Sequence, residues 1–179
     1  MIQGEKFKGF GKICYPQIGG VSSPSRPNPE FINSNELKRF LEDSVILIYR
    51  GAPFLRCLVG RIDTPNACHL LFIAPRDVTL VRREIWRPKE TGKLIYPDKE
   101  LILPPSDTDV TKLVLQRTIT ENPAKKDVII EAGKYYLGTI SVEGIEFQNR
   151  SIRLGIQTPE QIKSLPYEIW EAKNGIKWP

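Results

Sequence analysis

The sequence predicts a β-rich α+β fold, with mostly antiparallel strands in a sheet, a sandwich or an open barrel, and two short helices. Short apolar segments rich in β-branched and aromatic residues recur between turn residues along most of the chain. Residues 151–156 alternate between polar or small and apolar side chains, which is the period of a strand with one buried face. Strands do not alternate with helices, and this disfavours a parallel sheet.

Length and composition favour a single domain over residues 1–179. The chain is 40% hydrophobic, which is enough to bury one sizeable core. We expect an extended arm rich in Pro, Ser and Gly at about residues 18–32 and an aromatic tail at about 167–179. Uninterrupted apolar runs are far shorter than the roughly 20 residues of a membrane-spanning helix, and no secretory signal is visible. These features predict a cytoplasmic protein without membrane contact.

The first regular element that we expect is a helix over residues 34–43. Asn33 can cap this helix, and Glu36 stands three residues later, at the spacing of a capping box. Three apolar residues then follow the helical period and would form one buried stripe. These residues are Leu37, Phe40 and Leu41.

A run of strands is expected to follow. Residues 50–53 separate two apolar segments and are typical of a hairpin connection. Residues 68–74 are apolar nearly throughout, which predicts a central strand. The strand candidates are residues 45–49, 54–62, 68–74, 78–86, 94–96, 101–103, 112–120, 127–131 and 135–142, then 145–147 and 152–156 after a turn at 143–144.

A second short helix is expected at residues 159–165. Thr158 can cap it, and Pro159 would take the first helical position, where its missing N–H costs nothing. The tail that follows contains Trp170 and Trp178. Aromatic residues in a tail favour docking onto the body of the protein or onto a partner.

The common catalytic motifs are absent. The sequence has no G-x-S-x-G, P-loop or G-x-G-x-x-G pattern. Cys14, Cys57 and Cys68 lack the spacing of zinc or thioredoxin sites, and we interpret them as buried thiols. The single histidine, His69, could serve a cysteine nucleophile as a general base, but a strand position without a catalytic role is favoured. We therefore predict no catalytic residue, no metal site and no cofactor.

Two acidic patterns keep a metal-dependent function open as an alternative. A cluster of carboxylates around two prolines could hold a divalent cation, although a solvated loop is the favoured interpretation. Its members are Asp98, Glu100, Asp107 and Asp109. Glu171 and Lys173 have the E-x-K spacing of restriction-type nucleases, which bind Mg²⁺ with an additional acidic residue. Glu143 or Glu146 would have to supply that residue.

A basic segment is the basis of the nucleic-acid hypothesis. The net charge of +5 permits a polyanionic partner. Arginine binds phosphate oxygens with two hydrogen bonds, and an exposed tryptophan can stack on a base. The predicted nucleic-acid-binding residues are Arg82, Arg83, Trp86, Arg87, Lys89 and Lys93. In the alternative, this segment is an ordinary surface balanced by Glu84 and Glu90, with Trp86 in the core.

Together these features predict a non-catalytic binding or assembly subunit of a larger complex that contains nucleic acid, as an RNA- or DNA-binding component. Protein subunits of that complex are the expected partners, with nucleic acid as a further one. A metal-dependent nuclease that uses the E-x-K pair is one alternative. A purely structural protein–protein assembly module is the other.

Overall fold

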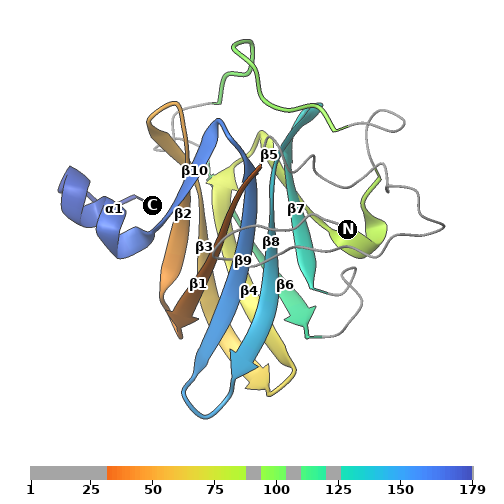
Figure 1. The fold of residues 1–179 in the computed structure, drawn as a ribbon, viewed down its shortest axis with the longest axis vertical. Helices are drawn as coiled ribbons and strands as arrows, with labels where there is room; N and C mark the ends of the chain where they lie inside the picture. Colours follow the sequence, from red (N-terminus) through yellow and green to blue (C-terminus); the bar gives the residue numbers. More distant parts are fainter. Residues whose placement is uncertain (1–31, 88–93, 104–109, 120–125, 179) are drawn as a thin grey trace.

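The computed structural model describes residues 32–87, 94–103, 110–119 and 126–178. These residues form two five-stranded sheets whose strands all pair antiparallel. The sheets stack face to face as a sandwich (Figure 1). The predicted β-rich antiparallel fold is therefore confirmed. Within the described part of the chain, no helix has the length and apolar character needed to cross a membrane.

Each sheet is built around three strands that are consecutive in the chain. The first sheet has the order β1 (Ile32–Phe40), β9 (Ser151–Pro159), β8 (Tyr135–Glu146), β7 (Asp127–Ala132) and β5 (Val78–Arg82). The second has the order β10 (Ile162–Pro166), β2 (Ser44–Tyr49), β3 (Ala52–Thr64), β4 (Ala67–Pro75) and β6 (Val110–Thr118). Strands β7–β8–β9 and β2–β3–β4 thus form meanders, and the flanking strands are added from elsewhere in the chain.

The main core fills the space between the sheets. In β2, Val45 and Leu47 belong to this core, whereas Ile46 between them packs on the outer face of the sheet. This alternation is the period-two pattern of a strand. Phe72 of β4 and Leu154 of β9 meet in the same core cluster and are fully buried. Each such side chain contributes about 1.5–3 kcal/mol through burial.

An aromatic tail covers part of the outer face of the second sheet. Helix α1 (Tyr167–Asn174) places Tyr167 and Trp170 against Ile46, and Trp178 joins them after the helix. The backbone N–H of Trp178 donates to the Tyr167 hydroxyl at 2.8 Å. The Arg56 guanidinium lies over the Tyr167 ring, 3.7 Å from its centroid. The tail is thus held on the body of the protein by packing and by polar contacts.

The helix predicted at residues 34–43 is wrong. These residues form β1, which pairs with β9 from Ile32 opposite Pro159 to Phe40 opposite Ser151. Leu37 packs against the core, whereas Phe40 is 47% exposed, so the predicted apolar stripe does not share one face. The long ladder with β9 outweighs the weak local helix signal.

The helix predicted at residues 159–165 is also wrong. Pro159 ends β9, and a turn at residues 160–161 leads into β10, which pairs with β2. The helix begins directly after Pro166 instead, as α1. Gly175 ends it in the left-handed conformation (φ 69°), with its N–H donating to the carbonyl of Glu171 at 2.8 Å. The glycine rule therefore holds at Gly175. Pro166 directly precedes the helix as its N-cap residue, so the first helical position is taken by Tyr167 and not by a proline.

Most predicted strands are confirmed, with four differences. The strand expected at 78–86 ends at Arg82 and continues as the short 3-10 helix η2 (Arg83–Ile85). Residues 94–96 contribute one isolated bridge, and residues 101–103 form no strand. The turn expected at 143–144 is a register shift inside the continuous strand β8. The arm expected at 18–32 lies outside the described residues except for Ile32.

Candidate functional site

The predicted basic segment follows the edge strand β5 of the first sheet. Arg82 is 46% exposed along its side chain, and its Nη1 lies 3.8 Å from a carboxylate oxygen of Glu84. Arg87 donates from Nη1 to the carbonyl of Trp86 at 2.8 Å. Lys89 and Lys93 lie outside the described residues. Arg82 and Arg87 are thus the two predicted residues that the structure leaves near solvent.

Trp86 lies in an apolar cluster on the outer face of the first sheet. It is only 5% exposed and packs with Ile129 and Tyr136. Its indole N–H donates to the Glu131 carboxylate at 2.7 Å. An indole held in this way presents no open face to a base. Trp86 is therefore a buried residue, as in the alternative interpretation of the basic segment.

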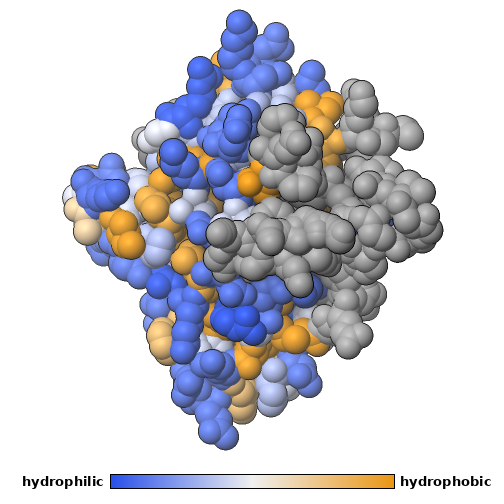
Figure 2. Space-filling model, in the orientation of Figure 1, coloured by the Kyte–Doolittle hydropathy of each residue, from blue (hydrophilic) through white to orange (hydrophobic). Residues whose placement is uncertain are grey.

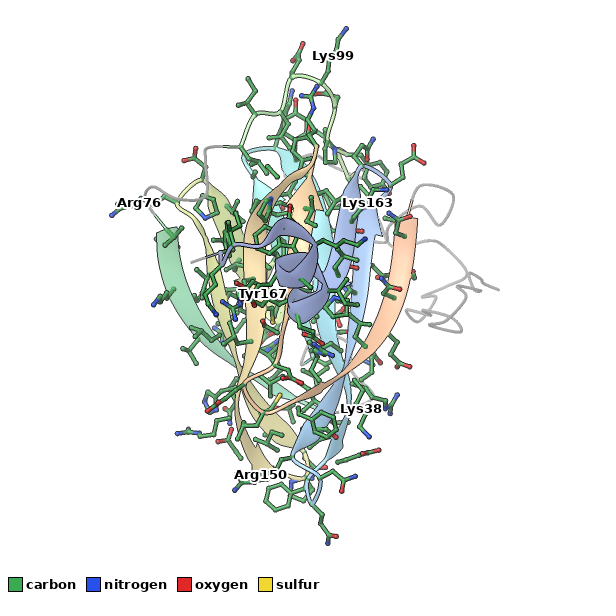
Figure 3. The ribbon with its side chains drawn as sticks, turned by 90° about the vertical axis from the view of Figure 1, so that its left-hand side faces the viewer. Lys38, Arg76, Lys99, Arg150, Lys163 and Tyr167 are labelled. Carbon is green, nitrogen blue, oxygen red and sulfur yellow. The ribbon has the colours of Figure 1, made fainter. Side chains whose placement is uncertain are left out.

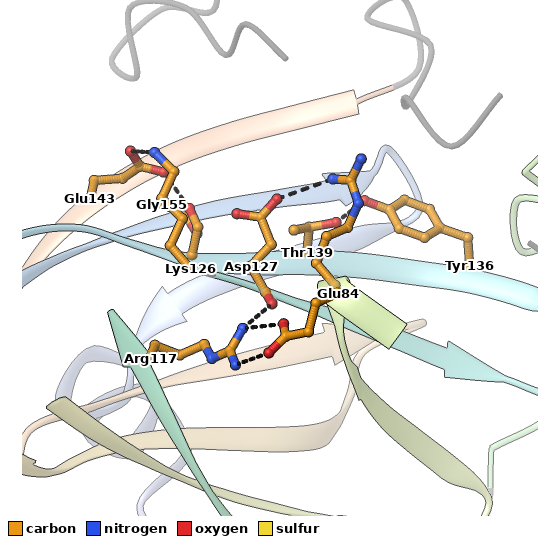
Figure 4. Close-up of polar contacts among 10 residues, drawn as sticks. Glu84, Arg117, Lys126, Asp127, Tyr136, Thr139, Glu143 and Gly155 are labelled. Carbon is orange, nitrogen blue, oxygen red and sulfur yellow. Dashed lines mark hydrogen bonds and ion pairs between the residues drawn. The ribbon is translucent and has the colours of Figure 1, made fainter. Parts of the chain in front are cut away.

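Arg83 belongs to a charged network that joins the two sheets (Figure 4). Its Nη1 lies 3.3 Å from a carboxylate oxygen of Asp127, which is almost fully buried. Arg117 of β6 donates twice to Glu84, at 3.1 and 3.0 Å. A further bond of Arg117 reaches the Asp127 carbonyl at 3.0 Å. The hydrogen bonds from Arg117 lower the pKa of Glu84 from its ordinary value.

The E-x-K residues lie on the exposed helix α1 rather than on a strand at the centre of a sheet. Glu171 is held in an ion pair with Lys177 at 3.1 Å, and Lys173 stands in the last turn. Among the residues that the structure describes, no group of three or more His, Cys, Asp and Glu side chains could hold a metal ion. The nuclease alternative stays a prediction, and no contact in the described part of the chain adds support to it.

The predicted acidic cluster is only partly described, because Asp107 and Asp109 lie outside the described residues. The carboxylate of Asp98 accepts hydrogen bonds from the Glu100 N–H at 2.9 Å and the Tyr135 hydroxyl at 3.0 Å. These bonds, the first above all, lower the pKa of Asp98. Asp98 thus stabilises the loop that contains it.

His69 lies on the outer face of the second sheet, beside Asp63. Its Nδ1 is 2.6 Å from a carboxylate oxygen of Asp63, which also accepts a hydrogen bond from Arg61 at 2.7 Å. Burial opposes ionisation of Asp63, but Arg61 and His69 together lower its pKa. Cys68 points into the core on the opposite face of the strand, and burial raises its pKa to about 12. His69 and Cys68 are therefore not arranged as a base and a nucleophile.

The sequence analysis did not predict a pocket at the end of the sandwich, where two turns meet strand β3. It has a volume of about 350 Å³. Its lining residues are Leu41, Gly60, Arg61, Ile62, Phe147, Gln148 and Arg150. They come from the β1–β2 turn, from β3 and from the β8–β9 turn. The volume lies at the lower end of the range for ligand pockets.

Backbone hydrogen bonds hold these connections together. The Leu41 N–H donates to the carbonyl of Arg150 at 3.0 Å, and the Glu42 N–H donates to the carbonyl of Val59 at 2.9 Å. Glu42 and Arg150 both adopt left-handed backbone conformations, with φ of 73° and 57°. Residues other than glycine rarely adopt this conformation, and they do so mainly in turns and at functional sites. The side chains at the pocket rim are therefore presented from fixed turns.

Exposed phenylalanine rings lie at this end of the molecule. Phe147 is 44% exposed at the pocket, and Phe40 is 47% exposed on the neighbouring strand. The Lys38 ammonium lies 5.4 Å from the centroid of the Phe40 ring. Figure 2 shows hydrophobic atoms among hydrophilic ones at this lower end. Figure 3 places Lys38 and Arg150 together there, far from Lys99 at the opposite end.

Two arginines at the pocket rim remain accessible. Three cations nearby are in ion pairs: Lys38 with Glu146 at 3.2 Å, Arg153 with Glu36 at 3.0 Å and Arg61 with Asp63 at 2.7 Å. Arg61 is 70% exposed in spite of its contact with Asp63. The Arg150 side chain makes no ion pair or hydrogen bond with any residue that the structure describes.

Comparisons with protein-family models, with curated proteins and with solved structures find no match for this chain. The chemistry of the pocket is therefore the guide to function. A pocket lined by an exposed aromatic ring and two arginines can stack a planar base on the ring and bind phosphate through the guanidinium groups. In the sequence, the only local signal for this pocket is that Phe147 and Arg150 belong to one turn. Arg61 lies far from them in the chain, and only the fold brings it into the same pocket.

Proposed function

We propose that the protein is a non-catalytic binding subunit of a larger, cytoplasmic complex that contains nucleic acid. We further propose that it contacts a single strand of RNA or DNA through the pocket at the β8–β9 end. The observation that supports this most is that the exposed Phe147 ring lines the same pocket as Arg61 and Arg150. No cofactor is needed for this function.

Each part of the pocket has a task in this proposal. Phe147 stacks on one base, a contact that contributes about 1–3 kcal/mol and tolerates any sequence. Arg61 and Arg150 bind the phosphates on either side, since guanidinium groups hold phosphate oxygens with short, charge-assisted hydrogen bonds. Two phosphate contacts make a small footprint, so we expect modest affinity from this surface alone. Further subunits of the complex would supply the rest of the binding energy.

The basic segment keeps a lesser role in this proposal. Arg82 and Arg87 are near solvent and can add phosphate contacts at a second position. Arg83 and Trp86 support this indirectly, because they hold η2 against the first sheet through Asp127 and Glu131. Their substitution is therefore expected to affect folding before it affects binding.

The proposal predicts a defined pattern of binding to a labelled single-stranded oligonucleotide, measured by fluorescence anisotropy. For two phosphate contacts, log K should fall with log salt with a slope of about −1.4. The substitution Arg150→Glu should weaken binding about tenfold or more, since a hydrogen bond to a charged group contributes about 1.5–3 kcal/mol. Phe147→Ala should weaken it by a similar factor through lost stacking.

The matched control is Lys99→Glu, which changes the net charge equally at the opposite end of the molecule (Figure 3). It should leave the affinity within about twofold if the pocket is the binding site, because charges that far apart are screened at moderate salt. Absence of binding at low salt would contradict the proposal. Equal losses for Arg150→Glu and Lys99→Glu would also contradict it, by showing that only net charge matters.

A further inference from the structure

Strand β6 forms an open edge of the second sheet. It pairs with β4 from Val110 opposite Pro75 to Thr118 opposite Ala67, without a register shift. No other described strand pairs with its outer side, and Figure 3 shows it (green) as the outermost strand on one side. Leu113 and Val114 are 38% and 56% exposed. This edge thus presents backbone N–H and C=O groups together with apolar side chains, which is a template for strand pairing.

The other three edges have features that oppose pairing. Strands β5 and β10 have only five residues each, and β10 ends in Pro166. Strand β1 lies beside β10, and the amides of Asn33 and Asn35 donate to Ile162 and Ser164 at 3.1 and 2.9 Å. Short length, proline and cover by a neighbouring element all protect an edge. Strand β6 is longer, with nine residues, and contains no proline.

We propose that β6 pairs antiparallel with β6 of a second copy of this chain, about a twofold axis at Val114. The two second sheets then form one continuous sheet, and each copy uses the same surface. In this register Val114 lies opposite its own counterpart, and all nine residues of the strand find a partner. The opposed pairs are Leu113 with Leu115, Lys112 with Gln116, Thr111 with Arg117, and Val110 with Thr118.

Charge and apolar matching favour a second copy in this register. No like charges oppose each other, and Lys112 lies across from the neutral Gln116. Arg117 does not obstruct the edge, because its guanidinium turns inward to Glu84 and to the Asp127 carbonyl. Other registers of this strand pair must differ from it by two residues, because a shift by one residue would move each side chain to the other face of the joined sheet. Such shifts shorten the overlap and place Lys112 opposite Val114, or Leu113 opposite Arg117.

This pairing is independent of the nucleic-acid proposal, because it does not use the pocket. It buries the exposed Leu113 and Val114 side chains against Leu115 and Val114 of the second copy. The twofold axis also directs the two pockets toward opposite ends of the dimer. Together with the proposed function, this arrangement gives an assembly module with two separate binding ends.

Sedimentation velocity of the full chain over a range of concentrations tests the inference. The wild-type chain should be a dimer at tens of micromolar. Val114→Lys and Val114→Glu should each raise the dimer dissociation constant at least about tenfold, because each places like charges directly across the axis. An equimolar mixture of the two variants should dimerise again, because opposite charges then meet. Circular dichroism of each variant checks that it is folded.

The control is Ile176→Lys, which introduces the same charge at an apolar residue that is 61% exposed in the tail. This variant should dimerise like the wild type. A wild-type chain that stays monomeric at all concentrations would overturn the proposal, and so would folded Val114→Lys protein that remains dimeric. A mixture of the charged variants that stays monomeric would contradict the axis at Val114.

Discussion

At the scale of single residues, Arg117 shows what the buried charges do in this molecule. Its side chain is only 3% exposed, and it bonds to the Glu84 carboxylate and the Asp127 carbonyl. Burying a guanidinium costs several kcal/mol unless good hydrogen bonds and an opposite charge offset the cost. The network meets that requirement and connects β6 of one sheet with η2 beside the other. These charges therefore stabilise the fold and do not contribute to a surface that binds a polyanion.

The network predicts a pH-dependent contribution to stability. Arg117 lowers the pKa of Glu84 below its ordinary value of 4.5. Glu84 therefore stabilises the fold above about pH 4.5, and this contribution is lost as the pH falls through the lowered pKa. Glu84→Ala should reduce the free energy of unfolding at pH 7 by about 3 kcal/mol, since Arg117 loses the Glu84 carboxylate. Urea unfolding at pH 7 and at pH 3 measures both effects.

The double variant Glu84→Ala/Arg117→Met is the control for this prediction. It should be less destabilised than Glu84→Ala alone, because replacing both members of a buried pair removes the desolvation cost of the charge. Equal unfolding free energies for Glu84→Ala and the wild type at pH 7 would contradict the structural role given to the pair.

Residue-level features were predictable only where they depend on local sequence. The apolar surroundings of Cys57 and Cys68 indicated buried thiols, and both are fully buried. For Trp86 the sequence left two interpretations open, an exposed ring that stacks on a base or a buried core residue. The charged residues around it did not decide between them, because charged side chains occur both on open surfaces and in buried ion networks. The contact between Glu84 and Arg117 spans 33 positions and requires the pairing of β6 with β4, which no local pattern shows.

At the scale of elements, α1 shows how a correct rule can be applied to the wrong residue. Two prolines seven positions apart, Pro159 and Pro166, could each precede a helix. The segment between them pairs with β2 instead, and the helix that forms places Tyr167 and Trp170 on the sheet. Local sequence signals do not show whether this segment forms a helix or a strand, because the outcome depends on pairing with β2. The strands themselves were easier to predict, since their period-two pattern follows from burial on one face.

Helix α1 should depend on its packing for stability, because a helix of eight residues is too short to be stable alone. Trp170→Ala should reduce the free energy of unfolding by about 3 kcal/mol, near the lower end of the range for buried aromatic residues. Ile169→Ala, in the same helix but at a residue that is 44% exposed, should change it by less than about 0.5 kcal/mol. Equal effects in urea denaturation would contradict the packing of α1.

At the scale of the whole molecule, the sandwich brings together turns that are far apart in the chain. The turn after β1 and the turn after β8 meet through the Leu41–Arg150 hydrogen bond, and Arg61 of β3 completes the pocket. The fold class was predictable from periodicity, but this meeting point depends on sheet order and on face-to-face stacking. In the predicted basic segment, Arg83 and Trp86 take part in the fold, whereas Arg82 and Arg87 stay near solvent. The pocket residues were not predicted as a site.

The most direct test of the proposed function is a map of amide chemical shifts during titration of the isotope-labelled protein with a short single-stranded oligonucleotide. The pocket account predicts that the largest shift changes occur together at residues 41–42, 60–62 and 147–150. Changes confined to residues 82–87, or spread evenly over the surface, would contradict it.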